Sequence, residues 1–452
     1  MKNYSDIYFL GIGGIGMSAI ARYYAFKGFR VSGYDRTPSP LTAELEAEGI
    51  SIHYEDNPSL IPSDVAGTLV VYTPAVPTEL AEFQYVINNG YKIVKRSRML
   101  GEIAEGQECL AVAGTHGKTT TSTLVAHILK DSGEGCSAFL GGISKNYGTN
   151  LLVSDNPVIV AEADEFDRSF LQLHPAIAAI TAMDADHLDI YGDLAHYQDA
   201  FRKFASQVSG SLVLKYGLPV GAGDTPAKIY TYHLSDPRAD FRAENLRMDA
   251  LGHYTYDLVL PGGRIKDIRV GTLGALNVEN SVAAAAVCLL HGSEEDKIRQ
   301  AIGSYSGAKR RLDEHINTPS LTYIDDYAHH PEELAAAIGS IREMFPGRKI
   351  TGIFQPHLYS RTRDFAPEFA KALSALDKVI LLGIYPAREL PIPGVSSEII
   401  LKDISAPEKV LLEKGELLEY LAAEDIDVLA TFGAGDIDRL VEPICRLLSE
   451  RI

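Results

Sequence analysis

Cysteine is scarce in this 452-residue chain, and long apolar runs are absent. The four cysteines lie far apart, with neither the CxxC spacing of redox or metal sites nor the density of a secreted disulfide framework. No apolar run reaches the roughly 18 residues of a membrane span, and the apolar stretch near the amino terminus is too short for a signal peptide. We therefore expect a cytoplasmic protein in a reducing compartment, with no membrane insertion.

Positive charge is also in short supply. Lys and Arg number 42 against 60 Asp and Glu, which leaves a formal net charge of −18. This sign repels the phosphates of nucleic acids and the surfaces of anionic membranes, so both are poor candidate partners. Any anionic ligand must therefore be held by local chemistry.

Length and composition indicate several globular domains. At about 150 residues per domain the chain has room for three, and its 46% apolar and 23% charged residues are ordinary for a globular protein. Strand-like apolar runs alternate with amphipathic stretches, which predicts parallel sheets. The pattern predicts three α/β domains in series, at 1–105, 106–313 and 314–452. The clearest expected elements are strands at 68–72, 109–113, 350–354 and 428–432 and helices at 118–130, 280–290, 331–344 and 365–376.

A glycine-rich turn follows the first predicted strand. Residues 11–16 read GIGGIG, and Asp35 stands 19 residues beyond the last of these glycines. Such glycines let the backbone approach a pyrophosphate at a helix amino terminus, and the acidic residue accepts hydrogen bonds from a ribose. The alternative is a tight turn with no ligand. The residues predicted to bind a nucleotide diphosphate are Gly11, Gly13, Gly14, Gly16 and Asp35.

A second glycine loop opens the central domain. Residues 112–120 read VAGTHGKTT, a phosphate-binding loop in which Val112 replaces the usual first glycine. Lys118 would reach the β and γ oxygens of a nucleotide, and Thr119 would reach Mg²⁺. The alternative is a structural turn. The residues predicted to bind the phosphates are Gly114, Thr115, His116, Gly117, Lys118, Thr119 and Thr120.

Acidic and histidine side chains follow two later strands of the central domain. Glu162 lies in AEADEFD, and His187 lies in DADHLD. Carboxylate and imidazole groups at strand ends can hold a metal that neutralises phosphate charge. Taken alone, acidic loops at strand ends are more often solvated turns than metal sites.

Three further segments each allow a functional and a structural interpretation. Asn277 and Asn280 either touch a base or cap an Ala-rich helix. The basic segment 309–311 either clamps phosphate or forms a solvated linker. The segment DDYAHHP at 325–331 carries acidic and histidine side chains, and it also reads as a helix entry with proline in the first turn.

The two nucleotide loops discriminate between classes of function. A nicotinamide-dependent dehydrogenase would use the first loop to bind its cofactor but would have no use for the second loop. A non-catalytic nucleotide sensor leaves the acidic and histidine residues unexplained. An ATP-dependent enzyme that acts on a nucleotide-linked substrate uses both loops.

Taken together, these segments resemble the Mur ligase family of peptidoglycan synthesis. The resemblance covers nearly the whole chain and implies a Rossmann-like N-terminal domain, a central P-loop ATPase-like α/β domain and a Rossmann-like C-terminal domain, with hinges near 102–108 and 307–314. The segments that carry it, in chain order, are FLGIGGIGMSAIA, AGTHGKTTT, AEADEFDRSF, MDADHLDIY, LNVENSVAA, GAKRRLD, IDDYAHHPEE, FQPHLYSRTRDF and FGAGDI.

The resemblance implies an ATP-dependent ligase that uses Mg²⁺ and joins L-alanine to UDP-N-acetylmuramic acid through an acyl phosphate. The runner-up is the family branch that adds murein tripeptide in cell-wall recycling. A monomer or weak homodimer is expected. The roles implied are ATP phosphates for Lys118, magnesium for Glu162 and His187, the nucleotide region for Asn277 and Asn280, the γ-phosphate for Arg311, a contribution on closure for Asp326, and the amino acid for His329, Arg361 and Arg363.

The chain also departs from the family pattern. Several relatives carry a carbamylated lysine at the position where this chain has Phe201, which fits the alanine-adding branch. Leu358 stands where that branch often has arginine, so any role of that side chain is lost or has moved to Arg361 or Arg363. Val112 in the phosphate loop is the family's own form.

Overall fold

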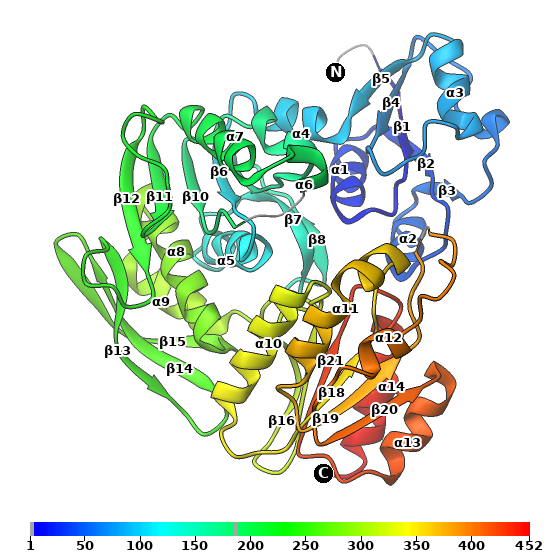
Figure 1. The fold of residues 1–452 in the computed structure, drawn as a ribbon. Coiled ribbons are helices and arrows are strands. Elements are labelled where there is room, and N and C mark those ends of the chain that lie inside the picture. The colour runs from blue at the N-terminus through cyan, green and yellow to red at the C-terminus, as the bar shows by residue number, and fades with distance from the viewer. Residues whose placement is uncertain (1–3, 185–187, 388) are drawn as a thin grey trace. The chain divides into compact units, whose positions relative to one another are not determined.

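The computed structural model describes residues 4–184, 188–387 and 389–452, which contain three sheets (Figure 1). The first sheet has five strands, all parallel, in the order β3-β2-β1-β4-β5. Every residue of β1 is buried, as expected of a parallel strand that is covered on both faces. The elements are β1 (Asp6–Leu10), α1 (Ile15–Phe26), β2 (Arg30–Tyr34), α2 (Pro40–Ala47), β3 (Ser51–His53), η1 (Pro58–Leu60), β4 (Thr68–Tyr72), α3 (Ala81–Asn88), β5 (Lys92–Lys95) and α4 (Arg96–Ala104).

The second sheet has ten strands in the order β15-β14-β13-β12-β11-β10-β6-β9-β7-β8. Its β6 strand pairs in parallel with β9 and β10, so the loops after these three strands meet at one edge. The strands are β6 (Glu108–Ala113), β7 (Ser137–Ser144), β8 (Thr149–Leu152), β9 (Val158–Ala163), β10 (Ile177–Ile180), β11 (Ser211–Lys215), β12 (Lys228–His233), β13 (Phe241–Met248), β14 (His253–Leu260) and β15 (Gly263–Leu273). The helices are α5 (Lys118–Asp131), η2 (Phe166–Gln172), α6 (Leu188–Tyr191), α7 (Leu194–Ser206), α8 (Ala275–His291) and α9 (Glu295–Ser304).

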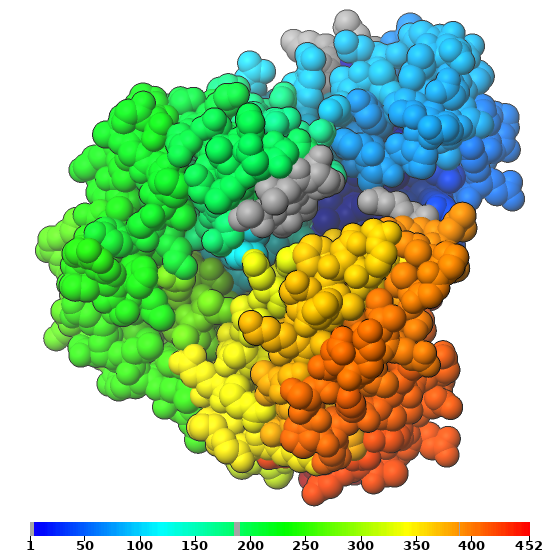
Figure 2. Space-filling model, viewed as in Figure 1, coloured from blue at the N-terminus to red at the C-terminus, as the bar shows by residue number. Residues whose placement is uncertain are grey.

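The third sheet has six strands in the order β16-β17-β21-β18-β19-β20, of which only β16 is antiparallel to its neighbour. In the space-filling view its residues form one continuous body, yellow through red (Figure 2). Its elements are β16 (Asp313–Asn317), β17 (Thr322–Asp326), α10 (Pro331–Met344), β18 (Ile350–Phe354), α11 (Tyr359–Leu373), β19 (Lys378–Leu382), α12 (Glu398–Leu401), β20 (Glu408–Leu412), η3 (Lys414–Glu416), α13 (Leu417–Ala423), β21 (Val428–Phe432) and α14 (Asp438–Ser449).

The chain divides into two compact units. The first unit contains residues 1–244, 257–268 and 279–306, and the second contains 245–256, 269–278 and 307–452. The division passes through β13, β14, β15 and α8. The predicted hinge near 307–314 begins where the last segment of the second unit begins, whereas no division between units falls at the predicted hinge near 102–108. The domain limits at 105 and 313 stay a prediction.

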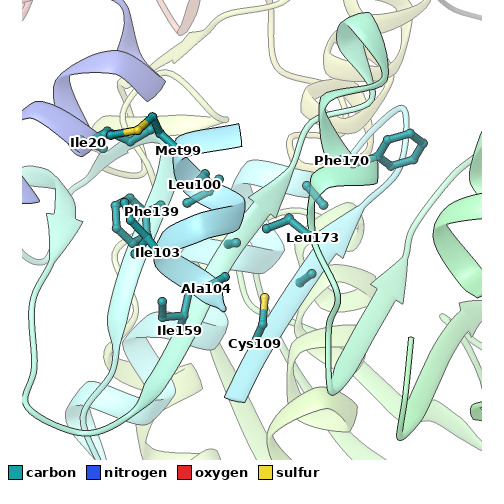
Figure 3. Packing of buried hydrophobic residues seen from close by; sticks show 14 of the residues in the cluster. Ile20, Met99, Leu100, Ile103, Ala104, Cys109, Phe139, Ile159, Phe170 and Leu173 are labelled. Carbon is teal, nitrogen blue, oxygen red and sulfur yellow. The ribbon is translucent and has the colours of Figure 1, made fainter. Parts of the chain in front are cut away.

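A shared hydrophobic core explains why no division occurs near residue 105. Met99, Leu100 and Ile103 of α4 pack with Ile20 of α1, and they lie in the same cluster as residues of the second sheet (Figure 3). The labelled partners from that side are Cys109, Phe139, Ile159, Phe170 and Leu173. Residues 103 and 104, which fall within the predicted hinge at 102–108, are instead the buried end of a helix.

A buried polar contact joins the same two sheets. Nη1 of Arg22 in α1 donates to Oδ1 of Asn150 in β8 at 2.5 Å, and the Asn150 amide donates to the carbonyl of Ile15 and the hydroxyl of Ser18. Buried polar groups are costly unless paired, so these bonds fix α1 against the second sheet.

No helix in the part of the chain that the structure describes is both long and apolar enough to span a bilayer.

Aromatic rings fill the space beneath the acidic segment of the central domain. Phe201 of α7 is fully buried, with its ring centroid 5.1 Å from that of Phe170 and 5.2 Å from that of Tyr197. Phe170 also stacks on Phe204 at 5.1 Å. These edge-on and stacked pairs are favourable aromatic geometries, so the position is part of the core.

Two predicted helices begin earlier than the sequence indicates. α8 starts at Ala275 rather than at 280, and α11 starts at Tyr359 rather than at 365. Pro367 lies inside α11, and the helix is kinked at Phe365, where φ is −122°. Proline removes a backbone donor and disturbs the preceding turn of a helix. The predicted start at residue 365 therefore coincides with the kink in α11 and not with its first residue.

Candidate functional site

The phosphate loop lies between β6 and α5, as predicted. Gly114 has φ of +138°, and a Cβ atom there would collide with the Thr181 side chain at the end of β10. The Thr181 hydroxyl donates to the carbonyl of His116, which closes the loop against the neighbouring strand. Only glycine fits Gly114, because both its backbone conformation and its lack of space exclude a side chain.

Lys118 is held by carboxylate and carbonyl oxygens in this structure. Its Nζ lies 2.9 and 2.8 Å from the two carboxylate oxygens of Glu165, 2.5 Å from the carbonyl of Gly114 and 3.3 Å from that of Thr115. Burial opposes the charge of Lys118, but the carboxylates of Glu165 and Glu162 outweigh it and raise the pKa of Lys118. Lys118 is therefore a buried cation within the phosphate loop.

Glu165 is a residue of this site that the sequence analysis did not single out. It follows β9, is 1% exposed, and its carbonyl accepts a hydrogen bond from the hydroxyl of Tyr191. Burial raises the pKa of Glu165, against the opposing effect of Lys118. Asp167 and Arg168 after it adopt left-handed backbone angles, which interrupt the short helix η2. The motif AEADEFD contains Glu165, but sequence spacing alone does not tell which carboxylate meets the lysine.

The predicted metal ligands are only partly described. Glu162, at the end of β9, pairs in register with Val112 of β6, so it stands one strand away from the phosphate loop. Its carboxylate packs over Gly141, where a Cβ atom would collide with both oxygens. Thr119 lies buried in the first turn of α5. His187 lies outside the described residues.

The oxygen donors present fit magnesium. Mg²⁺ is usually bound by one or two carboxylates together with substrate phosphates. Within residues 4–184, 188–387 and 389–452, no three His, Cys, Asp or Glu side chains gather in a cluster suited to a metal. Glu162 and Thr119 would therefore hold the ion jointly with nucleotide phosphates.

The two asparagines predicted for the nucleotide region differ in their placement. Oδ1 of Asn280 lies 2.7 Å from the position of a Cβ atom built on Gly117, and it accepts a hydrogen bond from Thr121 at 3.4 Å. Asn280 thus lies against the phosphate loop. The Asn277 amide donates to the carbonyl of Leu273 at 2.8 Å, a contact at the start of its own helix.

The first glycine loop is shaped by Asp35. The backbone NH of Gly13 donates to Oδ2 of Asp35 at 2.7 Å, and the NH groups of Gly11 and Ile12 donate to the carbonyl of Tyr34. Helix α1 then begins after Gly14 with no side-chain cap and no acidic residue in its first turn. Its amino terminus therefore keeps the positive potential that attracts anions. The ribose role of Asp35 stays a prediction.

In the second unit, Asp326 and Arg311 stand at the end of β17. Both carboxylate oxygens of Asp326 accept backbone bonds, from Leu312 at 2.7 Å and from Ala328 at 2.8 Å. Burial raises the pKa of Asp326 to about 6, although Arg311 and these bonds oppose the shift. The Arg311 guanidinium lies 5.0 Å from the ring centre of Tyr327. Asp326 thus holds the segment that carries Arg311 in place.

A group of histidines lies beside these residues. Nδ1 of His329 lies 3.1 Å from the Glu333 carboxylate, and the His329 ring meets the His357 ring edge-on at 6.0 Å. Burial disfavours the charge of Glu333, but the hydrogen bond from His329 outweighs it and holds the pKa of Glu333 well below its usual range. His357 stacks on Tyr385 at 5.7 Å.

The two arginines predicted to bind the amino acid differ. Arg361 is half-buried in the first turn of α11. Arg363 is 53% exposed and pairs with the adjacent Asp364 at 2.7 Å. Leu358 precedes the helix with φ of +71°, a left-handed conformation that is strained for a branched side chain.

Comparison with known proteins agrees with this architecture. The profile "Mur ligase family, catalytic domain" matches residues 6–108, "Mur ligase middle domain" matches 112–288, and "Mur ligase, glutamate ligase domain" matches 310–435. A UDP-N-acetylmuramate--L-alanine ligase of Porphyromonas gingivalis is 52% identical over 98% of each chain. The enzyme of the same name from Parabacteroides distasonis is 51% identical over 99% of this chain and 98% of its own.

Solved structures show the same fold. The UDP-N-acetylmuramate-alanine ligase of Thermotoga maritima superposes with a TM-score of 0.84 at 28% identity, over 99% of this chain and all of its own. A murein peptide ligase from Psychrobacter arcticus gives a TM-score of 0.71 at 20% identity over 98% of both chains, which supports the fold alone. The predicted three-domain α/β architecture is confirmed, and the chain belongs to the Mur ligase family.

Proposed function

We propose that this protein joins L-alanine to the lactyl carboxylate of UDP-N-acetylmuramic acid and converts ATP to ADP and phosphate. The observation that carries the proposal is that the first unit holds two glycine loops, with the acidic segment 161–167 next to the lysine of the second loop. Relatives that are about half identical over nearly their whole length carry the name of this activity.

The reaction requires activation because a free carboxylate is a poor electrophile. A carboxylate oxygen of UDP-N-acetylmuramic acid attacks the γ-phosphorus of ATP, the bond to the β-phosphate oxygen breaks, and ADP leaves. The product is an acyl phosphate. Lys118 stabilises the negative charge on the transferring group, a role in which one buried cation is worth several kcal/mol, on the order of a hundredfold or more in rate. Magnesium held by Glu162 and Thr119 would neutralise further phosphate charge.

Amide formation completes the reaction. The neutral amine of L-alanine attacks the acyl carbon, and phosphate leaves from the tetrahedral intermediate. A base takes the amine proton; His329, His187 and solvent are the candidates. In this proposal Arg311 contacts the γ-phosphate, and His329 and Arg361 take the amino acid. Arg311, His329 and Arg361 belong to the second unit, and Lys118 belongs to the first.

Phosphate release from ATP tests the proposal. It is measured with UDP-N-acetylmuramate and L-alanine, with UDP-N-acetylmuramate and murein tripeptide, and with UDP-N-acetylmuramate alone. Release that depends on L-alanine supports the proposal. Release that depends on the tripeptide instead assigns the chain to the recycling branch, and release independent of the sugar nucleotide overturns both assignments.

A further inference from the structure

Arg96 lies over the start of the helix that follows the first glycine loop. It is the first residue of α4, directly after β5, and its side chain is 18% exposed. A Cβ atom built on Gly16 would lie 2.7 Å from Nη1 of Arg96 and 3.2 Å from its Cδ. The guanidinium therefore stands against the first turn of α1, on residues whose spacing predicts a diphosphate site.

This position is electrostatically unfavourable for a cation unless an anion lies nearby. The amino terminus of α1 has the positive end of the helix dipole, with no side-chain cap and no acidic residue in its first turn. In the structure the compensating anion is Asp164, whose Oδ2 lies 3.2 Å from Nη2 of Arg96. Asp164 belongs to the acidic segment of the central domain, so the carboxylate comes from outside the sheet that carries the glycine loop.

The neighbouring residue of that segment makes the same kind of contact at the other loop. Glu165 holds Lys118 in the phosphate loop, and Asp164 holds Arg96 at the first glycine loop. Two consecutive carboxylates thus pair with the cation in the phosphate loop and with the cation beside the first glycine loop. Because a carboxylate and a phosphate offer similar acceptor oxygens, each carboxylate stands where a phosphate oxygen can bind.

Arg96 also faces the predicted metal ligand. Arg96, Asp164 and Glu162 line one small crevice, together with Ser97 and Ser169. Arg96 thus borders both this crevice and, through its contact with Gly16, the first turn of α1. An arginine is suited to such a place because its planar fork binds two phosphate oxygens at once.

We propose that Arg96 binds the diphosphate of the sugar nucleotide and exchanges its bond to Asp164 for bonds to phosphate oxygens. The assignment rests on the proposed function, since it takes the ligand of the first loop to be a UDP-sugar. It adds a side-chain cation to a loop that otherwise offers only backbone NH groups.

Equilibrium binding of UDP and of uridine to the full-length chain tests the assignment. Arg96→Ala should weaken UDP binding about ten- to a hundredfold, the range for loss of a charge-assisted hydrogen bond, and should leave uridine binding within twofold. The matched control is Arg98→Ala on the same helix, because Arg98 is 63% exposed and pairs with Glu102. This control should bind UDP as the wild type does.

Asp164→Asn separates binding from a purely structural role. Asparagine keeps the Oδ1 acceptor for the backbone NH of Phe166 at 3.0 Å but releases the guanidinium, so UDP should bind about threefold more tightly. If the Arg96–Asp164 pair is only structural, Arg96→Ala and Asp164→Asn weaken UDP binding alike. If Arg96→Ala does not fold, Arg96→Lys replaces it in the test. Lysine keeps the charge but lacks the planar fork, so its affinity for UDP should lie between those of the wild type and a variant without the charge.

The outcomes also separate this assignment from the proposed function. If the wild type binds UDP and Gly13→Val abolishes binding while Arg96→Ala behaves like Arg98→Ala, the assignment of Arg96 is wrong and the proposed function stands. If the wild type binds neither UDP nor UDP-N-acetylmuramate, both are wrong.

Discussion

Removing the phosphate-loop lysine should damage stability as well as catalysis, because Lys118 is one half of a buried ion pair. In Lys118→Ala the Glu165 carboxylate stays buried and loses its partner. Breaking a buried pair in this way costs about 3–5 kcal/mol of unfolding free energy. Removing both charges should restore most of that loss, since replacing a buried pair by uncharged side chains is often neutral.

The dependence of this loss on pH has a definite sign. Burial raises the pKa of Glu165, and removing Lys118 takes away the main effect that opposes that shift. A carboxyl whose pKa is higher in the folded state binds more protons when folded, so stability falls as pH rises. Lys118→Ala should therefore be closer to the wild type at pH 5.5 than at pH 8.

Urea unfolding at both pH values, together with phosphate release from ATP, measures the two effects separately. Lys118→Ala and the double variant Lys118→Met, Glu165→Gln should both lose at least about a hundredfold in kcat. The double variant alone should recover stability. Equal stability of Lys118→Ala and the wild type at pH 8 would refute the reasoning, because the buried carboxylate would then need no partner.

Four further predictions concern single positions. Gly13→Val should raise KM for the UDP-sugar far more than KM for ATP, because its Cβ would press on Asp35 2.8 Å away; steady-state kinetics with each substrate varied measures both constants. Glu162→Ala should raise the Mg²⁺ concentration needed for half-maximal turnover, as a magnesium titration of phosphate release would show. Arg361→Ala should raise KM for L-alanine or lower kcat, and the effect should be larger than that of Arg363→Ala, because the Arg363 side chain is exposed and paired with Asp364. Burial raises the pKa of Asp326 to about 6, so the stability that its protonated form contributes is lost as pH rises through 6. The stability of Asp326→Asn relative to the wild type should therefore be greater at pH 7.5 than at pH 4.5, as urea unfolding at the two pH values would show.

Much of the fold follows from local sequence patterns. The strands at 68–72, 350–354 and 428–432 and the helix at 331–344 have the predicted bounds, because buried parallel strands are short apolar runs and Pro331 marks a helix start. The strand at 109–113 and the helix at 118–130 are each confirmed within one residue. The fold class follows from this alternation.

The parts that sequence could not provide depend on distance in space. Glu165 and Lys118 are 47 residues apart, and three other acidic residues near Glu165 were equally plausible partners. Arg96 carries no motif that distinguishes it from Arg98, although only Arg96 lies against Gly16. The continuous core around α4 was also missed, because polar residues 102 and 105 flank the buried Ile103 and Ala104.

The aromatic ring of Phe201 limits the chemistry that is available at its own position. The side chain is enclosed by Phe170 and Tyr197, so the position offers neither an amine to react with carbon dioxide nor space for the carbamate that would form. No carbamate can therefore form on the side chain at position 201.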